Sequence, residues 1–183
     1  MYETVIQLDL TQDDLYVRHQ KMDRLMSEQQ DRQPRDYLYA VQGDQVYLRA
    51  SRPRATVDGW RAMQIPTAEH SCTVSGIVYI DATRFDSRAR LLWRHPQFQA
   101  DYIGQRLAPL GSVSDVQALP QAGLPMSKPG TPKMLWTPLY FTAKAVITSA
   151  EDAANILRRG IGRGKAFGFG CVHIKPTTGE ATA

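Results

Sequence analysis

Five glycines within the eleven residues 160–170 constrain this chain more than any other feature. The segment follows a helical pattern, 150–159, and precedes a strand pattern, 171–175, so the chain must turn within it. Glycine accepts positive φ angles and lets another backbone approach closely. The N–H groups of such a loop can form a concave anion site, and Arg163 and Lys165 add positive charge there. This composition suits a phosphate ligand.

Two alternatives compete with a phosphate site in this loop. A nucleotide-binding P-loop requires glycine, four residues, then Gly-Lys followed by Ser or Thr. Here Gly164-Lys165 is followed by Ala166, Arg159 stands where the first glycine would be, and the loop follows a helix instead of a strand. The pattern therefore argues against a P-loop. A tightly packed corner that binds nothing stays open, because glycines are common in turns.

The positive charge of the chain is unevenly distributed. The 183 residues carry a net charge of +4, and the pI is about 9.2. Five Lys and Arg residues and no acid lie in 158–175, and five arginines against two acids lie in 84–106. Local basic fields of this kind suit a phosphate backbone. Nucleic acid is therefore favoured over a merely arginine-rich surface.

The remaining composition predicts a cytoplasmic protein. At 43% hydrophobic residues the chain can bury a core, but no apolar run approaches the ~20 residues of a membrane span. The first residues show no basic region followed by an apolar one, so we expect neither a signal peptide nor a membrane partner. Cys72 and Cys171 alone predict no disulfide framework and no metal site.

The pattern of the first eighty residues predicts a ferredoxin-like, or RRM-like, unit. Thr11, followed three residues later by Asp14, is a capping-box signature for a helix start. Gly43-Asp44 predicts a hairpin turn between two short strands. With one weak helix pattern included, the order is strand, helix, strand, strand, helix, strand, over 2–10, 11–27, 37–41, 46–50, 56–63 and 73–80.

The second half of the chain is less regular. Ser149 predicts the start of a helix that Gly160 ends. A proline-rich segment, 120–132, is typical of a loop, and the tail after Pro176 is expected to be disordered. The other predicted elements are a helix over 98–107, strands over 112–119 and 171–175, and a strand or hairpin over 134–148.

His19 is the titratable residue of greatest interest. It lies four residues after Leu15 and three before Met22, on the inward stripe of the first predicted helix, and Tyr16 lies three residues before it. A core or boundary histidine would explain this spacing, and so would a proton-transfer residue with a phenol beside it. No histidine has metal-ligand spacing to Cys, Asp or Glu, so no metal site is predicted.

Four blocks of the sequence, in order along the chain, resemble the CasE family, the CRISPR precursor-RNA endoribonucleases of Cascade-type complexes. Residues 14–20 resemble the family's first-helix motif, in which Tyr-x-x-His includes the catalytic histidine. Residues 158–176 closely resemble its terminal glycine-rich loop and last strand. The segments 35–39 and 101–111 are similar to the entry of its second strand and to its second-domain helix.

One segment departs from the family pattern. The family usually carries a run like Arg-Leu-Arg-Ala-Asn-Pro at the end of its central strand, whereas residues 78–84 here read Val-Tyr-Ile-Asp-Ala-Thr-Arg. Asp81 replaces a cation, and the Asn-Pro pair is absent. This departure is typical of a divergent branch, such as a type IV system.

The resemblance implies an α+β fold of two tandem ferredoxin-like (RRM-like) domains, 1–82 and 83–176, followed by a tail, 177–183. It implies that the substrate is a repeat hairpin in precursor CRISPR RNA. The 2′-OH upstream of the scissile phosphate would attack without a metal or other cofactor, leaving a 2′,3′-cyclic phosphate and a 5′-OH. His19 would act as general base or acid, and Tyr16 would orient groups or assist.

The resemblance also implies partners. The enzyme would keep its mature RNA and join other subunits of a Cascade-like complex. A non-catalytic RNA-hairpin-binding subunit, with a structural His19, and a metabolic enzyme on the same scaffold remain as alternatives. Basic residues and loop glycines are predicted to contact the RNA: Arg158, Arg159, Gly162, Arg163, Gly164, Lys165, Lys128 and Lys133.

Overall fold

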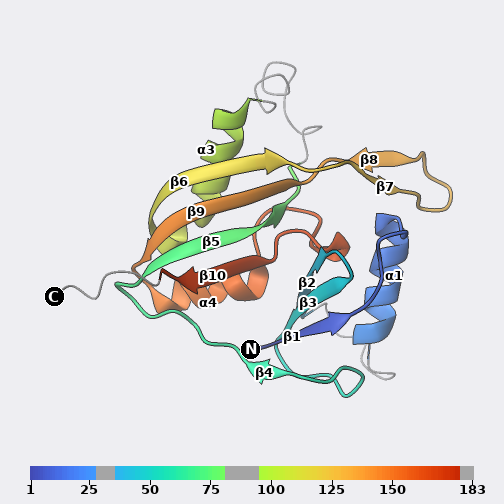
Figure 1. The fold of residues 1–183 in the computed structure, drawn as a ribbon, viewed down its shortest axis with the longest axis horizontal. Helices are drawn as coiled ribbons and strands as arrows, with labels where there is room; N and C mark the ends of the chain where they lie inside the picture. The colour runs from blue at the N-terminus through green and yellow to red at the C-terminus, as the bar shows by residue number, and fades with distance from the viewer. Residues whose placement is uncertain (28–35, 81–94, 178–183) are drawn as a thin grey trace.

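Two antiparallel four-stranded sheets organise the computed structural model of the chain, which describes residues 1–27, 36–80 and 95–177 (Figure 1). Each sheet lies in a unit with its own hydrophobic core, and a two-stranded hairpin projects beside them. We call the two parts the N-terminal and the C-terminal unit.

The N-terminal unit places one helix against a sheet with the strand order β2-β3-β1-β4. Met22 and Met26 of the helix pack on the sheet through Tyr39 and Leu48. All of its strand pairs are antiparallel. Its elements are β1 (Tyr2–Gln7), α1 (Leu15–Met26), β2 (Tyr37–Gln42), β3 (Gln45–Ala50) and β4 (Arg61–Ala62).

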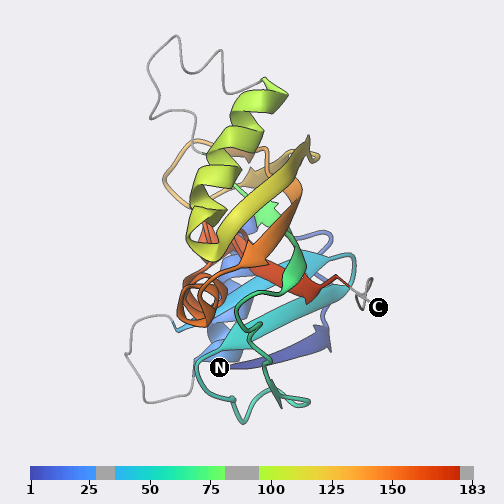
Figure 2. The same cartoon turned by 90° about the vertical axis from the view of Figure 1, so that its left-hand side faces the viewer.

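The C-terminal unit has the strand order β10-β5-β9-β6, and its two long helices cover one face of the sheet (Figure 2). Between β6 and β9 the chain forms the separate hairpin of β7 and β8. The elements are β5 (Ser71–Val78), α3 (Pro96–Leu107), η2 (Ala108–Leu110), β6 (Gly111–Pro120), β7 (Leu124–Met126), β8 (Met134–Trp136), β9 (Leu139–Ile147), α4 (Ala150–Arg159), η3 (Lys165–Phe167) and β10 (Val172–Pro176).

Both sheets have the ferredoxin-like arrangement. Numbered within its own unit, each sheet runs fourth, first, third, second strand, and every neighbour is antiparallel. The C-terminal unit has the full order of strand, helix, strand, strand, helix, strand, with the hairpin of β7 and β8 inserted between its middle strands. The predicted α+β fold class is confirmed.

Two elements that the sequence predicted for the N-terminal unit differ from the prediction. The weak helix over 56–63 does not form, because Gly59 has a left-handed φ of 75° and the Thr4 hydroxyl donates to the carbonyl of Asp58. The strand expected over 73–80 is β5, which pairs with β9 and β10 in the other sheet. The predicted domain division at 82/83, like most of the tail, lies outside the described residues.

The start of α1 also differs from the predicted cap. Thr11 donates from its backbone N–H and its hydroxyl to the Asp9 carboxylate, at 2.9 and 2.6 Å, and so is held in a turn before the helix. Asp14 is the N-cap instead, accepting from the N–H of Val17 at 2.9 Å. At the other end of the chain, Ser149 caps α4 as predicted.

The proline-rich segment 120–132 is not wholly a loop, since it contains β7. Leu124 and Met126 of β7 pair with Trp136 and Met134 of β8. Pro125 lies in a strand with only one partner, where proline is tolerated. The hairpin extends beyond the second sheet and lies over the first turn of α1 (Figure 1).

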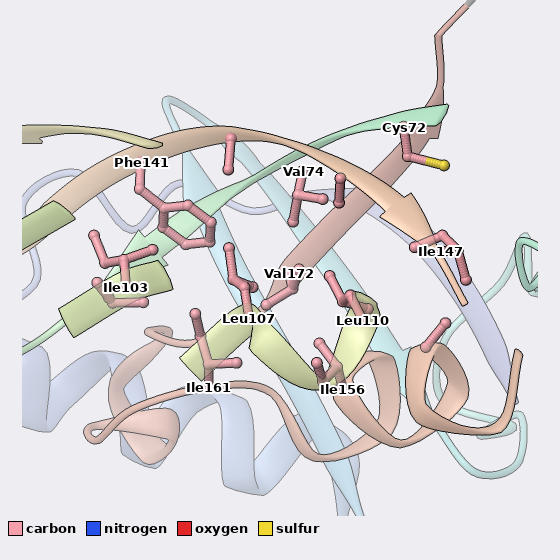
Figure 3. Packing of buried hydrophobic residues seen from close by; sticks show 14 of the residues in the cluster. Cys72, Val74, Ile103, Leu107, Leu110, Phe141, Ile147, Ile156, Ile161 and Val172 are labelled. Atoms are coloured by element: carbon pink, nitrogen blue, oxygen red, sulfur yellow. The ribbon is translucent and has the colours of Figure 1, made fainter. Parts of the chain in front are cut away.

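Apolar side chains from the sheet and helices of the C-terminal unit form the larger core (Figure 3). Phe141 and Val74 face Ile103 and Leu107 of α3, all of them almost fully buried. Alternate residues of β9 are buried and exposed, as expected for a sheet with one covered face. This core fixes α4, and thereby the glycine-rich segment that follows it.

A buried arginine links the two units. Arg49 of β3 is 3% exposed, and its Nη1 donates to the carbonyls of Leu157 and Val172, at 3.0 and 2.9 Å. Leu157 lies in the last turn of α4, where a cation is favoured by the helix dipole. Beside it, the Tyr47 and His173 rings meet edge to face at 5.4 Å.

This junction predicts an acid-sensitive stability. Burial, with a further contribution from Arg49, lowers the pKa of His173 from its ordinary 6.5. The unfolded chain therefore binds the proton more readily, and stability present above pH 6.5 is lost as pH falls. Between about pH 7 and pH 5, we expect the melting temperature of the His173→Gln variant to fall less than that of the wild type. His70→Gln, at an exposed histidine, is the control; melting curves that shift in parallel would contradict this assignment.

Candidate active site and nucleic-acid interface

An aromatic cluster joins α1 to the glycine-rich segment and the β7–β8 hairpin. Leu15, Met126 and Phe169 are its buried centre, and Tyr16 packs against them. The Trp136 ring stacks on Tyr79 at 4.1 Å and meets the edge of Phe167 at 5.1 Å. Residues from both units therefore form one continuous surface beneath the first turns of α1.

His19 lies at the edge of this cluster. Its ring meets Phe167 of η3 edge to face, with 5.5 Å between centroids, and its side chain is 27% exposed. Because Phe167 comes from the far end of the chain, the two units hold the imidazole jointly. Of the core and boundary positions that helix spacing allows, the structure shows the boundary one, because the ring packs on Phe167 and the side chain is still partly exposed.

A carboxylate lies beside the same histidine, and a phenol holds that carboxylate. Asp23 is four residues further along α1, and its Oδ2 lies 3.6 Å from Nε2 of His19. The hydroxyl of Tyr37 donates to Oδ1 of Asp23 at 2.5 Å, which fixes that carboxylate. A carboxylate so placed can help to orient an imidazole. Sequence reasoning missed Asp23, although its spacing to His19 is the one at which helix side chains meet.

Tyr16 lies one helical turn before His19, as predicted, and its ring belongs to the aromatic cluster. It is partly buried, so the phenol is positioned by packing from both units. The structure thus brings the two predicted catalytic residues to the same border between α1, η3 and the hairpin.

The glycines of 160–170 are explained by close packing. A Cβ on Gly168 would lie 2.8 Å from the Tyr39 ring, and one on Gly164 would lie 2.7 Å from Phe169. Both have positive φ angles. The N–H groups of Phe167 and Phe169 donate to the carbonyl of Gly164, so these amides cannot also bind an anion. The corner is therefore built for packing, and its cationic side chains are what it presents outward.

Basic side chains from three elements converge beside this corner. Burial and the nearby charges of Arg106 and Arg159 lower the pKa of Lys165. Arg159 ends α4, while Arg106 is exposed on α3 with its guanidinium 5.2 Å from the Tyr102 ring centre. Like charges held this close favour an anionic ligand. Arg106 was not among the predicted contacts, because only folding brings α3 next to this corner.

The other predicted contacts lie in two places. Arg158 and Arg163 are exposed near the basic cluster, and Gly162 has a positive φ, where a Cβ would make only ordinary contacts with Val78 and Tyr79. Lys128 and Lys133 are exposed in the turn of the β7–β8 hairpin, well apart from α4 (Figure 1). The departure at Asp81 and the arginines of 84–94 lie outside the described residues.

Metal and membrane sites can be assessed for the described part of the chain. In residues 1–27, 36–80 and 95–177, no three His, Cys, Asp or Glu side chains gather closely enough to hold a metal ion. Over the same ranges, no helix combines the length and apolar character needed to span a membrane.

No protein-family model and no curated protein sequence matches the chain, but solved structures match nearly all of it. The crystal structure of the CRISPR-associated protein Cas6e from Escherichia coli K-12 is 20% identical, with a TM-score of 0.68. A chain of a CRISPR RNA-guided surveillance complex is 21% identical, with a TM-score of 0.72. The CRISPR endoribonuclease Cse3 bound to a 19-nucleotide RNA is 16% identical, with a TM-score of 0.68.

Each of these matches covers 96% of this chain and 100% of the other. The resemblance stated from the sequence is thus confirmed at the level of fold, although identity is low. The chain has the fold of the Cas6e and Cse3 structures, built from two ferredoxin-like units in tandem.

Proposed function

We propose that the protein is a metal-independent endoribonuclease that cleaves repeat hairpins in CRISPR precursor RNA. The observation that carries this proposal is the setting of His19, a partly exposed imidazole between Phe167 and Asp23. It is supported by the basic cluster of Arg106, Arg159 and Lys165 and by the fold shared with an RNA-bound endoribonuclease, Cse3. A phosphodiester substrate suits this combination of cations and one proton-transfer group.

In the proposed reaction the 2′-OH upstream of the cut attacks the adjacent phosphate. The bond from phosphorus to the 5′-oxygen breaks, which leaves a 2′,3′-cyclic phosphate and a 5′-OH. The 2′-OH loses a proton and the departing 5′-oxygen gains one; His19 carries out one of these transfers and solvent water the other, while Asp23 helps to orient the ring. Tyr16 orients reacting groups from the neighbouring turn of α1. In-line alignment of the 2′-OH supplies much of the remaining acceleration.

The cations position the RNA and do not read its sequence. A-form RNA offers its phosphates, its shape and its 2′-OH groups more readily than its base edges. The basic cluster, with Arg158 and Arg163, holds the RNA backbone on one side of the active site. Lys128 and Lys133 hold the RNA backbone at the turn of the β7–β8 hairpin. The protein then keeps the mature RNA and docks with other subunits of a Cascade-like complex in the cytoplasm, as the surveillance-complex match suggests.

One observation favours a second candidate, a non-catalytic RNA-hairpin-binding subunit. The edge of His19 packs on Phe167 between the units, so the residue could serve the junction alone. Such a protein would bind the same hairpin and leave its length unchanged. Product analysis separates the two candidates.

The direct test is incubation with the CRISPR repeat RNA in excess EDTA. We expect one cut in the repeat and a product with a 2′,3′-cyclic phosphate end, because the attacking oxygen belongs to the RNA. Mass spectrometry of the fragments measures this. A strict requirement for Mg²⁺, or intact RNA that stays bound, would rule out the proposed reaction.

His19→Ala should remove cleavage and keep binding. We expect single-turnover rates to fall by roughly 10²–10⁴-fold, the contribution of a general acid or base, with hairpin affinity nearly native. Tyr16→Phe and Asp23→Asn should give smaller losses, since each leaves the imidazole in place. Thermal melting of the same preparations controls for folding. A folded His19→Ala protein that cuts at the native rate would end the assignment.

Lys165 should make RNA binding sensitive to alkaline pH. Because burial and neighbouring arginines lower its pKa, this amine loses its charge at a lower pH than an ordinary lysine. RNA affinity of the wild type should therefore weaken at alkaline pH before that of Lys165→Arg, which stays charged. Dissociation constants over about pH 7 to pH 10 measure the difference, with Lys175→Arg at an exposed lysine as the control. Identical pH dependence in wild type and Lys165→Arg would place Lys165 outside the RNA interface.

A further inference from the structure

A cleft of about 310 Å³ opens between the two units beside α1. Its lining includes Arg18 of α1, Gly43 in the β2–β3 turn, Gln121 before β7, and the aromatic pair Phe167 and Phe169. The volume is at the lower end for pockets that hold small molecules. It has room for one small planar group and its substituents, and none for a base pair.

Arg18 is a buried cation at this cleft. It is 9% exposed, and its Nε donates to the carbonyl of Asp13 at 3.1 Å. Within the part of the chain that the structure describes, its two Nη groups donate to no protein acceptor. The nearby Asp13 carboxylate is bound by Lys21 instead, at 2.6 Å. Neither Nη is a fully buried atom, so the guanidinium end opens to the cleft, where an anionic ligand can accept hydrogen bonds from it.

The other walls suit a flat, weakly polar group. Phe167 and Phe169 provide aromatic surface, and the Gln121 side chain adds polar atoms at the rim. A nucleotide combines these needs, because its phosphate can accept from both Nη groups and its base can lie against an aromatic ring.

The cleft adjoins the proposed active site. Phe167 contributes to the cleft and also meets the His19 ring at 5.5 Å. Consecutive residues of a helix point in different directions, so it is Phe167, and not the neighbouring position of Arg18 in α1, that joins the cleft to the imidazole.

We propose that this cleft binds one unpaired nucleotide of the RNA next to the cut, with its phosphate on Arg18 and its base against Phe167. The proposal rests on the proposed function and deepens it. It makes the single-stranded nucleotide beside the hairpin, and not the hairpin alone, part of what the protein recognises.

The test compares two RNAs, the repeat hairpin with and without its single-stranded flanks. A 2′-deoxy residue at the cut prevents cleavage, so affinity alone is measured. In the wild type the flanks should strengthen binding by roughly ten- to hundred-fold, as expected for a charge-assisted contact. Arg18→Met should lose this gain and bind the bare hairpin normally. Arg24→Met, which removes an exposed arginine of the same helix, should keep it.

Two further measurements keep the outcome decisive. If Arg18→Met does not melt cooperatively, Arg18→Lys, which keeps a charge but not the planar fork, should fold and lose part of the gain. Adenosine and uridine 5′-monophosphates, titrated at millimolar concentration and followed by NMR, should bind the wild type and not the folded Arg18 variant. If the flanks still strengthen binding by the same factor in a folded variant that lacks Arg18, the proposed subsite is overturned. If the wild type does not bind the hairpin, the proposed function is overturned. The mononucleotide titration then still tests whether the cleft binds a nucleotide.

Discussion

The Arg49 guanidinium is the interaction on which the rest of the arrangement depends. It crosses from β3 to the last turn of α4 and to β10, and so ties the N-terminal sheet to both ends of the glycine-rich segment. Breaking it would leave two buried carbonyls without a donor, at a cost of about 1–3 kcal/mol each. With this link in place, Phe167 reaches His19, and the hydroxyl of Tyr39 donates to the carbonyl of Ala166 at 3.1 Å.

Local signals allowed much of the fold to be predicted. Helix α4 has a serine cap and a glycine stop, and its position follows from them. The assignment of β5 failed for a physical reason: an alternating pattern predicts a strand but carries no information about its partners, which lie about seventy and a hundred residues away in β9 and β10. The weak helix over 56–63 failed because the Thr4 contact to Asp58 outweighs local propensity.

The candidate site divides in the same way. His19 and Tyr16 could be proposed because they share a face of one helix, and the charge near Lys165 was visible as a run in the sequence. Arg106 and the Arg18 cleft could not be predicted, since each acquires its setting only from segments far away in the chain. The glycines suggested an anion-binding loop, yet rings and carbonyls fill the space that side chains would need. Glycine content alone cannot distinguish a loop that lets a ligand approach closely from a loop against which other residues of the protein pack closely.

The contact between His19 and Phe167 has a consequence for biosynthesis. Helix α1 is synthesised well before Phe167 and before the Gly168 that rests on the Tyr39 ring. Until that later segment has been made, His19 lacks the aromatic ring that packs against it. A nascent chain therefore carries His19 without this contact, which forms only when η3 docks beside α1. The surroundings of His19 are thus completed after synthesis of the helix that carries it.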